Sequence, residues 1–281
     1  MDTGVYSRGQ MLARWPRREV DRAIADGRLA SLRRRWWARL DADPDVVRAV
    51  RAGGVLTCAS ALGKHGVWVP PTDRLHIRGN DATSRLRPDW CRQHGRQPAE
   101  CEAIDDLPTA LLHAARCLPS EDFVVICDSV LNRQLMSATD LAVLFATHPR
   151  GVVRSLELCD GRADSGTESM VRLRLRAPNL SIRPQVFIPG VGKVDFVVGR
   201  SMLIEVDGFE YHADPHAFEN DRLRDLHARA LGYDPIRLTY KQVVHQWRVV
   251  GPLLAEMIRR GDHHRRLATV VPTSIAREQA V

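Results

Sequence analysis

The chain has 281 residues, of which 44% are hydrophobic and 27% are charged, so it is long enough for two or three domains. No stretch approaches the roughly 20 consecutive apolar residues of a membrane span, and the first residues lack the pattern of a signal peptide. We therefore expect a cytoplasmic protein that does not contact membranes. The net charge of +7 favours an anionic partner, with nucleic acid before membrane.

Residues 1–44 predict a small winged helix-turn-helix domain. Ser7 and Gln10 have the spacing of a capping box at the start of a short helix. A second helix is predicted over residues 17–26, and residues 28–39 predict a pair of strands. The order of these elements is typical of a winged helix.

Basic side chains follow the second helix and the tip between the two strands of this domain. They are Arg17, Arg18 and Arg22 on the helix and Arg33 and Arg34 at the tip. A basic second helix with a basic wing suits a DNA major groove and its phosphates. The segment is similar to the N-terminal DNA-binding domain of abortive-infection-type antitoxins, which implies DNA as a partner. A general interaction module with solvated arginines is the alternative.

Residues 45–160 predict a mainly helical middle region, which resembles the rest of the antitoxin-type architecture. Helices are expected over residues 45–52, 56–64, 108–117, 122–131 and 139–148, with a short strand near 75–78 and a loop-rich stretch over 79–98. No catalytic motif stands out in this region. We interpret it as a spacer and scaffold.

The six cysteines include no Cys-x-x-Cys pair, so neither a zinc site nor a disulfide framework is indicated. Cys91, His94 and Cys101 come nearest to a metal cluster, but no fourth ligand stands at a sensible spacing. We expect buried, reduced thiols.

The most informative stretch is residues 193–208, where two apolar runs flank a Gly-Arg-Ser turn. This pattern predicts a β-hairpin. If paired residues sum to 400, Asp195 lies opposite Glu205 and Lys193 lies opposite Asp207, all on one face. The other face carries Val194, Phe196, Val198, Met202, Ile204 and Val206, and is expected in a core.

Two facing carboxylates repel each other unless a positive group lies between them. Asp195 and Glu205 therefore predict a divalent metal site, and hard oxygen ligands suit Mg²⁺ or Mn²⁺. An edge hairpin with a solvated polar face, whose charges Lys193 offsets, is the alternative.

An Asp followed about ten residues later by an apolar run that ends in Glu-x-(Lys or a substitute) resembles the core of the PD-(D/E)XK nucleases. Within that superfamily, the motif Ile-Glu-Val-Asp-Gly-x-x-x-His resembles the very-short-patch-repair-type endonucleases in particular. The resemblance covers about residues 165–240. It implies a restriction-endonuclease-like mixed sheet flanked by helices, and a catalytic group formed by Glu168, Asp195, Glu205, Asp207 and His212.

One residue departs from this pattern, because Asp207 stands where the superfamily has lysine. Asp207 is then a further metal ligand, with His212 in proton transfer, or Lys193 supplies the missing ammonium from the neighbouring strand. Glu168 also has a second interpretation, since Ser165 and Glu168 have the spacing of a capping box.

A helix is predicted from Pro215 to Leu231, with an apolar stripe formed by Phe218, Leu223, Leu226 and Ala230 and with Gly232 as its end. Arg222 and Arg224 on this helix contact phosphate or pair with Asp221 and Asp225. A strand over residues 236–240 and a helix over residues 242–260 follow. The segment 261–281 is expected to be a flexible tail.

Together these features predict an α/β protein of the α+β kind, with domains at residues 1–44, 45–160 and 161–260. The leading hypothesis is a DNA-binding, metal-dependent endonuclease of defence or repair. The alternative is a non-catalytic DNA-binding regulator, similar to an antitoxin-like repressor, with an inactive nuclease fold. The sequence leaves the oligomeric state open, with a homodimer among the alternatives.

Overall fold

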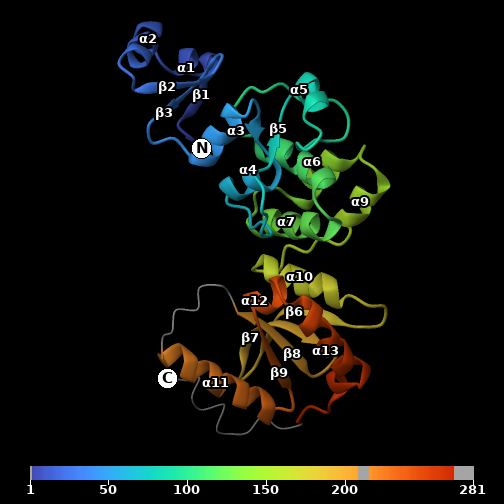
Figure 1. Cartoon of the computed structure of the whole chain (residues 1–281). Coiled ribbons are helices and arrows are strands. Elements are labelled where there is room, and N and C mark those ends of the chain that lie inside the picture. The colour runs from blue at the N-terminus through green and yellow to red at the C-terminus, as the bar shows by residue number, and fades with distance from the viewer. Residues whose placement is uncertain (1, 208–214, 269–281) are drawn as a thin grey trace. The chain divides into compact units, whose positions relative to one another are not determined.

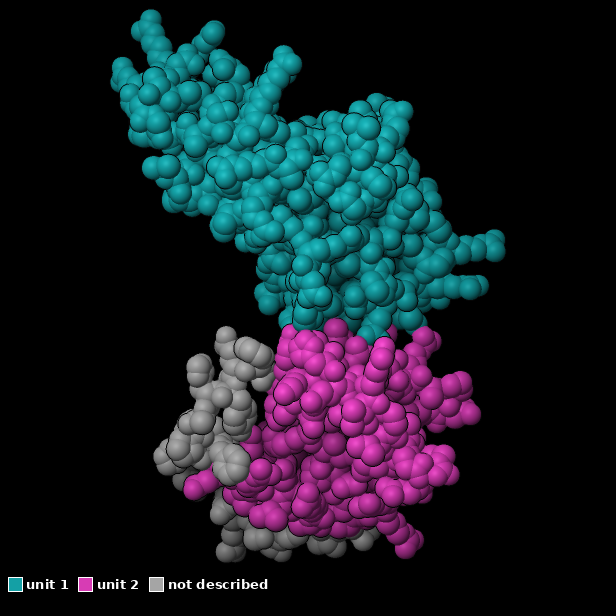
Figure 2. Space-filling view, in the orientation of Figure 1, with its two compact units in different colours: residues 1–159 teal, residues 160–281 magenta. Residues whose placement is uncertain are grey.

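The computed structural model describes residues 2–207 and 215–268, apart from the side chains of 215–218. Its elements are of the mixed α/β type (Figure 1). The chain divides into two compact units, Met1–Cys159 and Asp160–Val281, drawn in teal and magenta in Figure 2. This division lies within one residue of the predicted start of the third domain.

Unit 1 begins with two short helices and a three-stranded antiparallel sheet of order β1-β3-β2. The elements are β1 (Val5–Ser7), α1 (Arg8–Arg14), α2 (Arg17–Ala25), β2 (Leu29–Arg33) and β3 (Trp36–Arg39). The predicted capping box is confirmed, because the Ser7 hydroxyl accepts from Gln10 N–H while the Gln10 side chain accepts from Ser7 N–H. Gly27, at φ 73°, follows α2 where the sequence predicted the helix to end.

The rest of unit 1 is helical, with two short strands that pair with each other. Its elements are α3 (Pro44–Arg51), β4 (Val55–Leu56), α4 (Cys58–Lys64), β5 (Ile77–Arg78), α5 (Asp81–Leu86), α6 (Leu107–Cys117), α7 (Ser120–Asn132), α8 (Ala138–Phe145) and α9 (Arg150–Leu156). The five predicted helices are confirmed, whereas α5 and α9 were not predicted. One hydrophobic core joins the N-terminal sheet to these helices, because Val5, Trp36 and Ala38 belong to the same buried cluster as Val46 and Val50.

Unit 2 is built on a four-stranded mixed sheet of order β6-β7-β8-β9. Its elements are α10 (Gly166–Leu175), β6 (Ile182–Ile188), β7 (Gly192–Val198), β8 (Met202–Asp207), α11 (Pro215–Ala230), β9 (Asp234–Thr239), α12 (Tyr240–Val244), α13 (Trp247–Arg259) and the 3-10 helix η1 (Asp262–His264). The first three strands are antiparallel to one another, and β9 runs parallel to β8. The parallel pair requires a crossover, which α11 provides.

The predicted hairpin register is confirmed for the three residue pairs next to the turn. Phe196 pairs with Ile204 and Val198 with Met202, so paired residues sum to 400. The apolar side chains of the predicted core face are buried. Gly199 makes the turn with φ 62°, and an added Cβ there would lie 2.5 Å from the His263 ring, so both the turn and the packing require glycine.

The predicted apolar stripe of α11 is wrong for the side chains that the structure describes. Leu223 and Leu226 are 46% and 62% exposed, whereas Ala228 and the following Leu231 are buried. Ala228 and Leu231 pack on Val197 and Leu203 of the sheet. The helix otherwise turns charged residues towards the sheet, where they meet the opposite charges described below.

The C-terminal segment differs from its prediction in two ways. The single helix expected over residues 242–260 is interrupted between α12 and α13 at His245 and Gln246. The segment 261–268 is not a flexible tail, because the His263 carbonyl accepts from Arg200 N–H and Ala268 N–H donates to Leu231 O. Residues 269–281 of the predicted tail lie outside the described part of the chain. Among the described helices, none has the length and apolar character needed to cross a bilayer.

Candidate functional site

Two acidic side chains of unit 2 meet at one amide. Glu168, in the first turn of α10, is 4% exposed, and Asp195 of β7 is half-buried. The Gln185 side-chain amide donates to both, at 2.7 Å to Glu168 Oε2 and 3.4 Å to Asp195 Oδ1. The capping box predicted for Ser165 and Glu168 forms only in part. Ser165 Oγ accepts from Glu168 N–H and donates to its Oε1, but the Glu168 carboxylate accepts from Asp164 N–H rather than from Ser165 N–H. Glu168 therefore lies at the start of α10 and shares the Gln185 amide with Asp195.

Gln185 occupies an unusual backbone position. Its φ is 53°, and the pairing of β6 with β7 omits it, with Pro184 opposite Phe196 and Val186 opposite Val194. Such left-handed geometry is uncommon for a residue other than glycine and occurs often at binding sites. The Gln185 Oε1 atom is buried without a hydrogen-bond partner among the described residues. The arrangement thus leaves one free oxygen acceptor beside two carboxylates.

The pairing of β7 with β8 ends at Phe196 and Ile204, so the predicted pair of Asp195 with Glu205 is not among the pairs that form. There the Asp195 carboxylate accepts from Val206 N–H at 2.8 Å, so a side chain replaces a main-chain partner. The predicted pairing of Lys193 with Asp207 lies beyond the pairs that form. Lys193 Nζ instead lies 2.7 Å from Asp164 Oδ2, and its side chain is 57% exposed.

Glu205 and Asp207 are held by arginines. Arg237 lies next to Glu205 on the parallel strand β9, with Nη2 3.3 Å from Glu205 Oε2 and Nη1 3.5 Å from Asp207 Oδ1. Arg224 of α11 reaches Glu205 Oε1 at 3.2 Å and also donates to the main-chain oxygens of Val191 and Lys193. The Arg224 guanidinium therefore makes its hydrogen bonds within unit 2.

Burial raises the pKa of four carboxyl groups in this region above its usual value. For Glu168 the nearby charge of Asp195 adds to the effect of burial, and for Asp195 burial outweighs the hydrogen bond from Val206. Burial also dominates for Glu205 and Asp207, although Arg237 opposes it in both. Burial therefore disfavours the ionised form of all four carboxyl groups.

The other residues predicted for this site lie in different surroundings. Hydrogen bonding to Asp164 raises the pKa of Lys193, to which the charges of Glu168 and Asp195 also contribute. Arg222 is 64% exposed and lies 4.0 Å from Asp225, so it makes the expected pair along the helix. His212 lies outside the described residues.

The basic residues predicted for DNA contact divide into two groups. Arg17, Arg18, Arg22 and Arg34 are exposed. Arg33 differs from the expected free tip, because its guanidinium donates to the carbonyls of Gly53 and Gly54 and lies 2.6 Å from Glu100 Oε2. Arg33 therefore ties the hairpin to the rest of unit 1.

The donor atoms around Gln185 match the chemistry of a hard cation, since Glu168, Asp195 and the free Gln185 Oε1 all offer oxygen. The positions of these oxygen atoms fit a cation site less closely than their chemistry does. In the described part of the chain, no three carboxylates form a group that could hold a metal ion. The Glu205 carboxylate is paired with Arg224 and Arg237. Sequence reasoning missed Gln185 and Arg237, although the positive residue opposite Glu205 is readable once the β8–β9 register is known.

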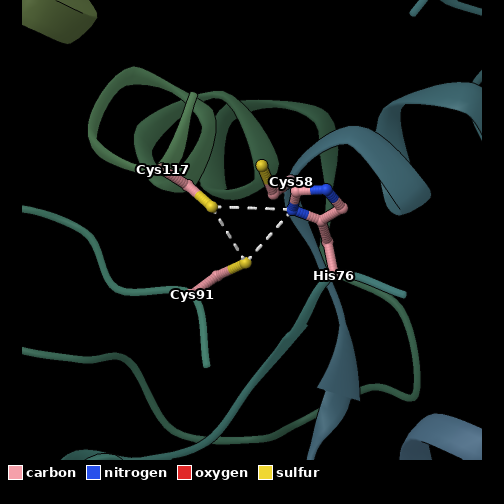
Figure 3. A group of neighbouring side chains, drawn as sticks. All are labelled: Cys58, His76, Cys91 and Cys117. Atoms are coloured by element: carbon pink, nitrogen blue, oxygen red, sulfur yellow. Dashed lines mark hydrogen bonds between the residues drawn. The ribbon is translucent and has the colours of Figure 1, made fainter. Parts of the chain in front are cut away.

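Four possible metal ligands come together that no spacing in the sequence predicted. Cys91 lies with Cys58, Cys117 and His76 (Figure 3), whereas His94 and Cys101, the candidates nearest to it in the sequence, lie outside this group. The His94 ring packs instead on His148, with ring centroids 5.7 Å apart, and Cys101 is exposed. The four residues of the observed group come from separate segments of the chain, so no local spacing pattern predicts the group.

Comparison of the chain with models of known families, with curated proteins and with solved structures found no match.

Proposed function

We propose that the protein is a metal-dependent DNA endonuclease, with a restriction-endonuclease-like domain in unit 2 and a winged helix at the start of unit 1. The observation that carries the proposal is the group formed by Glu168, Gln185 and Asp195. Buried Glu168 and half-buried Asp195, both with raised pKa values, share one amide whose own oxygen has no hydrogen-bond partner among the described residues. Such groups lower stability, and they occur most often at functional sites. A cation bound there would stabilise the ionised carboxylates of Glu168 and Asp195.

Each residue has a defined part in this proposal. Glu168, Asp195 and Glu205 would hold Mg²⁺ or Mn²⁺, with Asp207 as a further oxygen donor. The bound metal supplies an activated water and stabilises charge on the scissile phosphate. Gln185 keeps the first two carboxylates in position. The exposed Lys193 offers an ammonium for proton transfer or phosphate contact, and the resemblance gives His212 the same role.

The exposed arginines of α2 and the β2–β3 tip suit the phosphates of a duplex. The first 40 residues contain ten arginines against four acidic residues, so positive charge is concentrated there. Phosphate contacts of this kind provide affinity and register rather than sequence choice. We infer that this part of unit 1 brings DNA to the protein.

The decisive experiment is incubation of supercoiled and branched DNA with the full chain in Mg²⁺ or Mn²⁺, for wild type, Asp195→Asn and Glu205→Gln. Of these three proteins, we expect nicking or cleavage by the wild type alone. Glu256→Gln is the control and should cleave like wild type, because Glu256 is an acidic residue of α13 that is 46% exposed and pairs with Arg259. Equal cleavage by all four proteins, or cleavage in EDTA, would show that the activity belongs to a contaminant or to another site.

A second function is favoured by a specific observation. Arg224 and Arg237 already neutralise part of the acidic group, and a guanidinium in place of a metal is what a non-catalytic scaffold would keep. In that case the chain is a DNA-binding regulator similar to an antitoxin-like repressor. It would bind duplex DNA with an affinity that EDTA and Asp195→Asn leave unchanged, and it would cut none of the substrates.

A further inference from the structure

Three thiols and one imidazole meet inside unit 1, far along the sequence from one another. Cys58 begins α4, His76 precedes β5, Cys91 follows α5, and Cys117 ends α6. Figure 3 shows the three sulfur atoms around the His76 ring. Cys58, His76 and Cys91 are at most 3% exposed, and Cys117 is half-buried.

The distances among Cys91, Cys117 and His76 are close to those of a tetrahedral metal site, and Cys58 lies near enough to be the fourth ligand. One ligand atom from each residue lies within 4.8 Å of all the others. Cys91 Sγ is 3.4 Å from Cys117 Sγ and 3.3 Å from His76 Nδ1, and Cys117 Sγ is 3.6 Å from the same nitrogen. Zinc bonds of about 2.3 Å to sulfur and about 2.0 Å to nitrogen place tetrahedral ligands about 3.5–3.8 Å apart.

The surroundings of His76 select the ring form that a metal needs. Its Nε2 lies 3.1 Å from Thr72 Oγ1, while the Thr72 hydroxyl donates to the carbonyl of Arg74. The Thr72 oxygen is then free to accept, so the Nε2–H of His76 donates to it. Nδ1 keeps its lone pair and faces the sulfurs. Hydrogen bonding of the distal nitrogen is the usual way in which proteins orient a metal-binding histidine.

The thiols also differ from ordinary core cysteines. The Arg74 guanidinium lies 2.8 Å from Cys117 Sγ, where it stabilises a thiolate. Hydrogen bonds from Cys58 and Cys91 lower the pKa of Cys117, whereas burial raises that of Cys58. A pocket lined by Thr72, Arg74, His76 and Cys117, among others, opens beside the group and offers a path for an ion.

We propose that Cys58, His76, Cys91 and Cys117 bind one Zn²⁺ in a closed, structural site. Three thiolates and an imidazole form a donor set that prefers zinc to magnesium or manganese, and four protein ligands leave no position for a substrate. A disulfide would join two of the sulfurs and leave the third thiol and the imidazole unexplained. Each protonated thiol that becomes a ligand releases its proton to solvent, so binding weakens as pH falls.

The site would add a covalent link between elements that are otherwise joined by side-chain packing and hydrogen bonds. It links the start of α4 and the end of α6 to two segments with little regular structure, residues 65–76 and 87–106. Three hydrogen bonds from main-chain N–H groups position the ligands. His76 N–H donates to the Ser60 side-chain Oγ, Cys91 N–H donates to Ile77 O, and Thr57 N–H donates to His76 O. Zinc would therefore order the middle of unit 1, independently of the acidic site in unit 2.

The test is the metal content of the full chain, purified under reducing conditions without chelator and measured by plasma mass spectrometry. We expect about one zinc per chain, falling at least fivefold in Cys91→Ser and Cys117→Ser. Cys101→Ser is the control, because this cysteine is exposed and outside the group. His76→Cys should keep the metal, since four thiolates also bind zinc.

A second measurement uses wild type only, so it does not depend on whether the variants fold. Wild type stripped of metal and titrated with Co²⁺ should develop the sulfur-to-cobalt charge-transfer band and the strong visible bands of tetrahedral cobalt, reaching a plateau at one equivalent. Zinc should then displace the cobalt and abolish these bands. Folded, reduced wild type that contains no zinc and shows no such spectrum with Co²⁺ would overturn the proposal, as would equal zinc loss in Cys101→Ser.

Discussion

Arg237 and Glu205 lie side by side on the parallel strands β9 and β8, with Arg237 Nη2 3.3 Å from Glu205 Oε2. The same guanidinium lies within 3.5 Å of Asp207, Asp221 and Asp225. These hydrogen bonds and charges raise the pKa of Arg237 although burial opposes its charged form. One cation thus joins two strands and the crossover helix α11, which explains why α11 turns charged residues rather than leucines towards the sheet.

Arg237→Gln should destabilise unit 2 strongly. The change leaves several half-buried carboxylates without their cation, and the loss of one partner of a buried pair costs about 3–5 kcal/mol. Hydrogen exchange followed by mass spectrometry should show faster exchange in β8 and β9, with a smaller effect at acidic pH, where the carboxyl groups are protonated. Arg222→Gln, at a side chain that is 64% exposed, should change stability by about 0.5 kcal/mol or less. Similar exchange in the two variants would contradict this account.

Asp195→Asn should raise the stability of unit 2 near pH 7 in the absence of divalent metal. Because burial raises the pKa of Asp195 in the folded protein, the folded state binds the proton more tightly than the unfolded state. Wild type therefore loses stability as pH rises from about 3.9, the ordinary value for Asp, through the raised pKa, and the variant does not. The midpoint of thermal unfolding should be recorded for both proteins from pH 3.5 to 8. The two midpoints should be similar at pH 3.5 and should differ once the pH exceeds the raised pKa of Asp195. A variant that is less stable at pH 7 would show that the charged carboxylate is needed for the fold itself.

Magnesium should reverse this order if the acidic group binds metal. A ligand that binds only the folded state adds about 2.7 kcal/mol at a hundred times its dissociation constant. We expect Mg²⁺ to raise the unfolding temperature of wild type and to leave that of Asp195→Asn unchanged. Mg²⁺ is preferred to a softer ion, because the thiol group of unit 1 does not select it. An equal shift in both proteins would place the ion elsewhere.

Local patterns made much of the fold predictable. The Gly-Arg-Ser turn and the alternation on either side of it set the β7–β8 register, and Ser7 with Gln10 set the start of α1. What failed depends on long-range contacts. The Cys91 group could not be found from spacing, because its members are joined only when α4, β5 and α6 pack together. The buried side of α11 could not be found from hydrophobicity, because charge pairing with Glu205 and Arg237 decides it.

The tip of the β2–β3 hairpin offers a test in which neighbouring arginines should behave differently. Arg34→Glu should weaken binding to duplex DNA and reduce the slope of log affinity against log salt by about one, the effect of one lost phosphate contact. Its stability should be unchanged, because the side chain is exposed. Arg33→Glu should instead destabilise unit 1, since Arg33 binds Glu100 and the carbonyls of Gly53 and Gly54.

Fluorescence anisotropy at several salt concentrations, together with thermal unfolding of both variants, would separate the two effects. Arg18→Glu and Arg22→Glu on α2 should resemble Arg34→Glu in salt dependence. If DNA affinity is the same in all three of these variants and in wild type, the basic surface of this segment does not bind DNA. A change in affinity that appears only in Arg33→Glu would mean that the hairpin acts through the fold of unit 1 and not through phosphate contact.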